Sequence, residues 1–142
     1  SAASDVYKRQ FLYRLCRSYS HQIPSASLTG SQRDLQRVTH VMNWVKVHYP
    51  EPLSLETAAD SLALSKEYFC RLFKKYTGQT FLEYLNDVRT MHLYEDLQNS
   101  DETITVLMEK NGLSNYKIFM RTFKKLYGST PQKMRSNRIR HV

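Results

Sequence analysis

The sequence predicts an all-α fold of about seven helices, in which two copies of a small helical unit are joined by a long helix. The first observation is an internal repeat, because residues 68–78 recur as residues 118–128. The residues that recur fifty positions later include Arg71, Phe73, Lys74, Lys75 and Gly78. The second is that apolar residues in both segments have the spacing of a helix buried along one side. The third is a helical apolar pattern between them, over residues 80–97.

Residues 1–30 are expected to lie outside the repeated units. Residues 5–10 resemble a translated sequencing adaptor, so residues 1–10 are interpreted as an artefact, with an ordinary N-terminal tail as the alternative. Residues 11–30 are interpreted as the remnant of an upstream domain followed by a linker, because Pro24 and several serines favour turns. The natural protein is then expected to continue upstream.

The first unit is assigned to residues 31–79. Its first helix is expected over residues 32–49, from a capping box formed by Ser31 and Asp34 to the helix breaker Pro50. The stripe expected to be buried consists of Leu35, Val38, Val41, Met42 and Val45.

A pair of helices completes the first unit. A short helix over residues 55–61 is capped by Ser54, and a tight turn leads into a helix that starts after Ser65 and stops at Gly78. A short helix, a turn of three to four residues and a second helix form the helix-turn-helix plan.

The linker helix is assigned to residues 80–98 and begins at a capping box formed by Thr80 and Glu83. At a rise of about 1.5 Å per residue it forms a rod ~27 Å long. Residues 99–138 then repeat the helix-turn-helix plan, with a short helix over residues 103–110.

The second unit ends its repeat with a helix that begins at Ser114 or Asn115 and stops at Gly128. Met108 and Asn111 stand where the first unit has a small and an apolar residue. A bulkier side chain can force helices apart, and a buried polar one needs a hydrogen-bond partner. The second of the two long repeat helices is therefore expected to be seated less firmly.

The charge of the chain favours a polyanionic partner. The net charge is +8, and the isoelectric point is about 9.6. Residues 65–78, 114–128 and 129–142 each carry four Lys or Arg, with Glu67 as the single acid among them. The positive charge therefore belongs to the repeat helices and the tail.

Catalysis, metal binding and membrane insertion find little support in the sequence. The five histidines have no metal-ligand spacing, and four glycines form no phosphate-binding loop. Cys16 and Cys70 are too few for a disulfide framework, and no apolar run approaches the ~20 residues of a membrane span. We expect no catalytic residue, no metal and no cofactor, and a cytoplasmic protein that is not an enzyme.

A spaced pattern in the second unit is the most specific feature of the chain. It consists of Leu113, Ser114, Phe119, Arg121, Phe123, Lys124, Lys125, Gly128, Thr130 and Pro131. Together with residues 54–78, it resembles the DNA-binding domain of the AraC/XylS family of bacterial transcription regulators. The resemblance covers roughly residues 35–136. It implies a homeodomain-like fold in which residues 31–142 form a DNA-binding domain for double-stranded promoter DNA.

The resemblance also implies a role for the whole protein. That role is a sequence-specific regulator, an activator that recruits RNA polymerase, here without most of its N-terminal sensor domain. A homodimer would form through that missing domain. The residues that depart from the family pattern are Met108, Glu109, Asn111 and Ile118.

The family roles can be carried over position by position. The resemblance implies that the base-reading positions are Glu67, Cys70, Arg71, Tyr116, Lys117, Met120 and Arg121. The phosphate contacts would be Ser54, Lys66, Lys74, Lys75, Lys124 and Lys125. A salt bridge is the alternative role for Arg121, and a redox sensor the alternative for Cys70.

Two other functions stay open on the sequence. One is the DNA-binding part of a repair alkyltransferase fusion, which needs a metal-bound cysteine cluster that Cys16 alone does not supply. The other is a helical protein–protein adaptor, in which the basic faces are incidental. Salt-dependent binding to duplex DNA separates the adaptor from the regulator.

Overall fold

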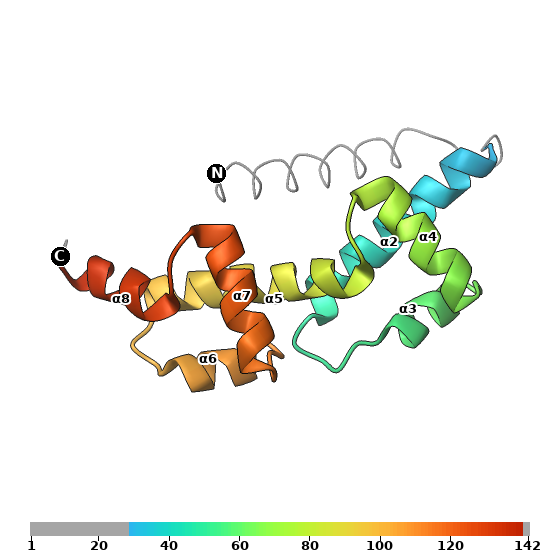
Figure 1. Ribbon diagram of the computed structural model, residues 1–142. Coiled ribbons are helices and arrows are strands. Elements are labelled where there is room, and N and C mark those ends of the chain that lie inside the picture. The colour runs from blue at the N-terminus through green and yellow to red at the C-terminus, as the bar shows by residue number, and fades with distance from the viewer. Residues whose placement is uncertain (1–28, 141–142) are drawn as a thin grey trace.

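The computed structural model describes residues 29–140, which form seven α-helices and no strand. Figure 1 shows two lobes joined by α5 (Phe81–Asn99), the long helix that runs through both. The other helices of the first lobe are α2 (Gly30–His48), α3 (Leu55–Ser61) and α4 (Lys66–Thr77). Those of the second lobe are α6 (Ile104–Lys110), α7 (Tyr116–Tyr127) and α8 (Pro131–Arg140). The predicted all-α fold with two helix-turn-helix units on a linker helix is confirmed, while the interpretations of residues 1–28 lie outside the described residues.

The first lobe is built around aromatic rings from α4 and α5. Phe69 and Phe73 have no exposed surface, and each meets the ring of Phe81 edge-on, with centroids 5.7 and 5.8 Å apart. Aromatic rings prefer this arrangement because of their quadrupoles. The predicted stripe of α2 covers this cluster, with Leu35 only half-buried and the other four residues buried. α3 adds Ala58 and Ala59, small residues that let α4 approach closely.

The second lobe repeats this plan around the other half of α5. Phe119 and Phe123 of α7 are fully buried, and Leu93 and Leu97 of α5 pack against them. The ring of Tyr94 stacks on the ring of Tyr127 with centroids 4.1 Å apart. α5 thus contributes residues to both cores, and so it sets how the two helix-turn-helix units are placed relative to each other.

The ends of α4 and α7 match the sequence prediction. The side chain of Ser65 accepts a hydrogen bond from the N–H of Tyr68 at 3.2 Å, and Asn115 caps α7 in the same way. Both helices end at a glycine in the left-handed region, with φ of 78° at Gly78 and 75° at Gly128. This region favours glycine because other residues carry a Cβ that clashes there.

The predicted start of the first helix is wrong. Its capping box is formed by Thr29 and Gln32, whose side chain accepts from the N–H of Thr29 at 2.7 Å. Asp34, which we expected in that box, instead accepts hydrogen bonds from Arg37 and from the hydroxyl of Tyr68 on α4. Ser31, the expected cap, lies inside the helix, and spacing alone did not decide between Thr29 and Ser31.

The two helix-turn-helix turns have the same backbone. Leu64 donates to the carbonyl of Ala59 at 3.0 Å, and Leu113 donates to that of Met108 at 2.9 Å. The turn residue in the left-handed region is Ala63 in the first unit, with φ of 55°, and Gly112 in the second, with φ of 76°. For alanine this conformation costs ~1–2 kcal/mol.

The polar residue in the second unit has partners. The side chain of Asn111 is 2% exposed, and its amide donates to Asp96 of α5 at 2.9 Å and to the carbonyl of Leu107 at 2.8 Å. Met108 is 7% exposed and belongs to the second core. Since the buried amide is hydrogen-bonded, Asn111 gives no reason to expect a loosely seated α7.

Candidate nucleic-acid interface

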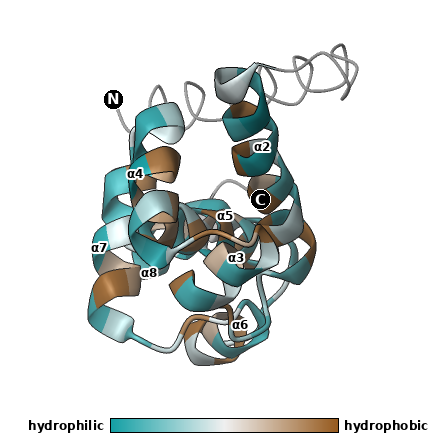
Figure 2. Cartoon of the chain, turned by 90° about the vertical axis from the view of Figure 1, so that its right-hand side faces the viewer, coloured by the Kyte–Doolittle hydropathy of each residue, from teal (hydrophilic) through white to brown (hydrophobic). Residues whose placement is uncertain are grey.

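α4 presents one polar face to solvent. The sequence places its large apolar residues on one side, so packing against α2, α3 and α5 turns the rest outward. Figure 2 shows this division, with hydrophilic residues on the side of α4 that faces away from α2. The exposed residues of this face are Lys66, Glu67, Cys70, Arg71, Lys74 and Lys75, and Tyr68 of α4 is exposed as well. All three base-reading residues predicted on α4 therefore lie on one accessible face.

α7 presents the matching face of the second unit, with one difference. Tyr116 is 53% exposed, and Lys117, Arg121, Lys124 and Lys125 are exposed as well. Met120 is only half-buried rather than exposed, because its side chain packs against the second core. Three of the four residues predicted to read bases on α7 are thus open to a ligand, and the fourth is partly covered.

Two arginines occupy equivalent places on these faces. Arg71 and Arg121 are both exposed, and neither takes part in the ion pairs found within residues 29–138. The salt bridge considered as an alternative for Arg121 is therefore not formed there. A free guanidinium offers a planar fork of donors, which suits bidentate recognition of a base edge or a phosphate.

The lysines differ in how far they are engaged within the protein. Lys66 lies 3.1 Å from Glu56 of α3, and a hydrogen bond to that carboxylate raises the pKa of Lys66. Lys75 lies over the ring of Tyr76, 5.5 Å from its centroid. Lys74 and Lys124 are exposed and form none of the ion pairs in the described part of the chain.

Lys125 departs from the role expected of it. Its Nζ lies 3.0 Å from the carboxylate of Asp87, whose side chain is 2% exposed in the middle of α5. Asp87 follows Asn86 in the linker helix, and nothing in its spacing indicated a partner on α7. The family resemblance implied a phosphate contact for Lys125, whereas in the structure Lys125 is paired with the linker helix.

Ser54 is occupied as well. It is the N-cap of α3, and its side chain accepts from the N–H of Thr57 at 3.0 Å. Its hydroxyl also lies 2.7 Å from that of Thr57. Ser54 is half-buried, so a phosphate would reach the start of α3 beside a side chain that already makes two hydrogen bonds with Thr57.

Part of the positive tail serves the fold. Arg135 donates to the carbonyls of Glu102 and Ser100, at 2.5 and 3.1 Å. Arg138 donates to the carbonyl of Leu97 and pairs with Asp101 at 2.8 Å. These arginines hold α8 against the end of α5 and the segment that follows it, so the tail offers less free charge than its composition suggested.

Other kinds of site find no support in the described residues. Between residues 29 and 140 there is no group of three or more His, Cys, Asp or Glu side chains placed to hold a metal ion. No helix in that range is both long and apolar enough to cross a membrane. Cys70 is free and exposed.

Comparison with known proteins identifies the family to which this architecture belongs. The chain is similar to a transcriptional regulator from Chromobacterium violaceum that contains an AraC-type DNA-binding domain. The two share 25% identity and a TM-score of 0.64, over 72% of this chain and 92% of that one. A family model described as a helix-turn-helix domain matches residues 58–137. The chain belongs to the AraC/XylS family of DNA-binding transcription regulators.

Two further AraC/XylS comparisons bear on function. The chain is 31% identical over 111 residues to the transcriptional activator RhaS of Escherichia fergusonii, covering 78% of this chain and 40% of RhaS. It is also similar to the DNA-binding domain of AdpA, a global transcriptional factor, solved in complex with a target DNA. That likeness has a TM-score of 0.66 and 26% identity, over 72% of this chain and 94% of that one. The chain spans only 18% of the length of the staphylococcal regulators it matches.

Proposed function

We propose that this chain binds duplex DNA in a sequence-specific way through the exposed faces of α4 and α7. One observation carries the proposal. α4 and α7 begin with the same kind of N-cap, end at a left-handed glycine and pack on one linker helix. At equivalent positions, each exposes one arginine (Arg71 or Arg121) and one lysine (Lys74 or Lys124) that form no ion pair in the described part of the chain. An isolated basic helix face is ordinary solvated surface, but a matched pair on a shared support is what two adjacent reading sites require.

Base reading is assigned to Glu67, Cys70, Arg71, Tyr116, Lys117, Met120 and Arg121. A helix fits the major groove, where each base pair shows a distinct pattern of donors and acceptors. Arg71 and Arg121 can each make a bidentate pair with guanine, and Glu67 can accept from the amino group of cytosine. Met120 is half-buried, so it is expected to contribute an apolar contact near the edge of the face.

Phosphate contacts are assigned to Ser54, Lys66, Lys74, Lys75 and Lys124, and the assignment of Lys125 is withdrawn from this set. Lysine neutralises phosphate and adds affinity without sequence information. Lys74 and Lys124 have equivalent places in the two units, so they are the best pair with which to test the idea.

The role of the whole protein is also a proposal. We infer an activator that recruits RNA polymerase, because the similar RhaS is described as a transcriptional activator. A sensor domain and a homodimer contact would then lie elsewhere in a longer protein, in keeping with the greater length of the relatives. Since its ligand would be promoter DNA, the cytoplasm is where such a protein would act.

The test is a base-substitution binding scan at fixed salt, on a duplex selected from a randomised library. Arg71→Ala should relax the preference at one position and cost ~1–3 kcal/mol there. Arg71→Lys is the matched control, since it keeps the charge but loses the bidentate fork. Lys74→Ala should weaken binding evenly across sequences.

Three results would contradict the proposal. If the wild-type chain enriches no motif, it does not read sequence. If Arg71→Ala and Arg121→Ala both leave every base preference unchanged, the reading faces have been assigned wrongly. An affinity for duplex DNA that does not respond to salt would favour a protein–protein adaptor instead.

A further inference from the structure

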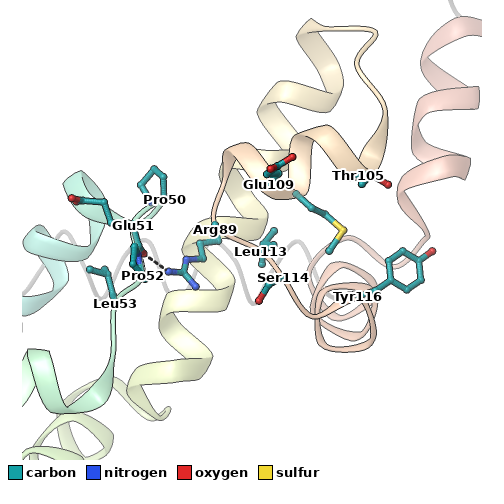
Figure 3. A pocket seen from close by; sticks show the side chains of 12 residues that line it. Pro50, Glu51, Pro52, Leu53, Arg89, Thr105, Glu109, Leu113, Ser114 and Tyr116 are labelled. Atoms are coloured by element: carbon teal, nitrogen blue, oxygen red, sulfur yellow. Dashed lines mark hydrogen bonds between the residues drawn. The ribbon is translucent and has the colours of Figure 1, made fainter.

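Besides sharing α5, the two helix-turn-helix units approach each other where the turn of the second unit meets the loop that follows α2. Arg89 lies in the middle of α5 and reaches the loop between α2 and α3, as Figure 3 shows. Its Nε donates to the carbonyl of Tyr49 at 2.6 Å, and its Nη2 donates to that of Glu51 at 2.7 Å. Both carbonyls follow the C-terminus of α2, where the helix dipole leaves partial negative charge that suits a cation.

The turn of the second unit lies against the same spot. A Cβ added to Gly112 would come within 2.9 Å of the carbonyl oxygens of both Tyr49 and Pro50. It would also lie 3.0 Å from Nε of Arg89. Glycine is therefore favoured at position 112 for two reasons. Its φ of 76° lies in the left-handed region, and the absence of a Cβ allows a close approach between the two units.

A ring stack borders this contact. The ring of Tyr49 lies nearly parallel to that of His92 on α5, with centroids 4.0 Å apart and an angle of 6° between their planes. The end of α2 is thus held to the linker helix by the carbonyl bonds of Arg89 and by this stack. Gly112 brings the second unit to the same place.

Open space lies beside the contact. A groove of about 770 Å³ is lined on one side by the loop of residues 50–53 and on the other by α6 and the start of α7. Figure 3 shows Arg89 reaching towards one wall, and Tyr116 and Ser114 at the other. Since side chains do not fill this groove, the two units have room to shift if the contact at Arg89 is lost.

We propose that Arg89 and Gly112 are positioning residues that fix the spacing between α4 and α7 along DNA. The inference rests on the proposed function and deepens it, because it assigns residues that do not touch DNA to the choice of site. α5 has 19 residues, so at ~1.5 Å each it spans ~28 Å, less than the ~34 Å turn of duplex DNA. The tilt of the two units relative to α5 therefore determines the distance between two DNA half-sites that α4 and α7 can bind at the same time.

The test is selection from a randomised duplex library, followed by binding to the selected site with one base pair inserted between its two half-sites. The variants are Arg89→Met, which keeps the stem without the donors, and Gly112→Ala. Arg33→Met, at an exposed arginine of α2, is the matched control. Arg89→Lys should restore the wild-type behaviour in part, since its ammonium group keeps the charge and can donate to a carbonyl but lacks the fork of arginine.

The wild type and the control should lose about tenfold or more on insertion, because one base pair moves the second half-site by ~3.4 Å and about a tenth of a turn. Arg89→Met and Gly112→Ala should lose less than about threefold, while each half-motif stays the same. Unchanged spacing penalties in both variants would overturn the inference and leave the proposed function intact. If both variants are unfolded at the selection temperature, the residues hold the fold and the positioning role is wrong. A wild type that enriches no motif would instead refute the proposed function.

Discussion

Lys124 and Lys125 are adjacent lysines, yet we expect Lys125 to stabilise the fold and Lys124 to contact DNA. Lys125 pairs with Asp87 at 3.0 Å, and the side chains are 42% and 2% exposed. Removing one partner of a fully buried pair costs ~3–5 kcal/mol. An exposed pair contributes only ~0–1 kcal/mol. The Lys125–Asp87 pair is half-exposed, so its contribution should fall between these two energies. Lys125→Ala should therefore lower the free energy of unfolding by about 2 kcal/mol.

Lys124→Ala is the matched control, because both lysines lie in the last turn of α7 and share its dipole. It should change the free energy of unfolding by less than about 0.5 kcal/mol and weaken DNA binding. Urea unfolding and duplex binding, each measured on both variants, separate the two effects. Equal stability of the two variants would refute the structural role of Lys125. A larger loss of DNA binding in Lys125→Ala, measured well below its unfolding temperature, would return it to the phosphate contacts.

The remaining predictions concern the fold. Phe73→Ala and Phe123→Ala should each destabilise their lobe by ~3–5 kcal/mol in thermal unfolding, because both rings are fully buried; an unchanged melting temperature would mean that the helix phase is wrong. Ala63→Gly should stabilise the chain by ~0.5–1 kcal/mol in urea unfolding, because it removes the left-handed strain of the folded state. The gain is not larger because glycine also makes the unfolded chain more flexible, which lowers stability. A loss of stability would show that the alanine methyl group packs usefully. Burial raises the pKa of Tyr127, so the stability it contributes is complete below pH ~10, the value for an unfolded tyrosine, and is lost as the pH rises above it. Tyr127→Phe should flatten the alkaline fall in stability, and a fall of unchanged steepness would contradict this role of Tyr127.

The repeat helices could be predicted from the sequence because their signals are local. Ser65 and Gly78 bound α4 through hydrogen bonds and φ values that involve only near neighbours. The apolar spacing of α7 likewise identified the buried Phe119 and Phe123. Because the opposite face follows from the buried one, the exposed residues of the candidate interface were largely found as well.

The contacts between distant segments could not be predicted in this way. Lys125 is separated from Asp87 by 38 positions, and Arg89 from the Tyr49 carbonyl by 40. Neither lysine nor arginine signals by its type whether it meets a phosphate, a carboxylate or a backbone carbonyl. Tyr68 shows the same limit, since its hydroxyl donates to Asp34, 34 positions away, and this hydrogen bond raises the pKa of Tyr68.

The central claim is that both α4 and α7 contact the same duplex. The measurement that tests it most directly is the salt dependence of the binding constant for the wild type, Lys74→Ala and Lys124→Ala. If ~6–10 phosphates are contacted, wild-type affinity should fall ~10³–10⁵-fold between 50 and 200 mM salt. Each variant should reduce the slope of log K against log salt by about one. A slope that stays unchanged in either variant would mean that its unit does not touch the phosphates, and a flat wild-type dependence would contradict the account as a whole.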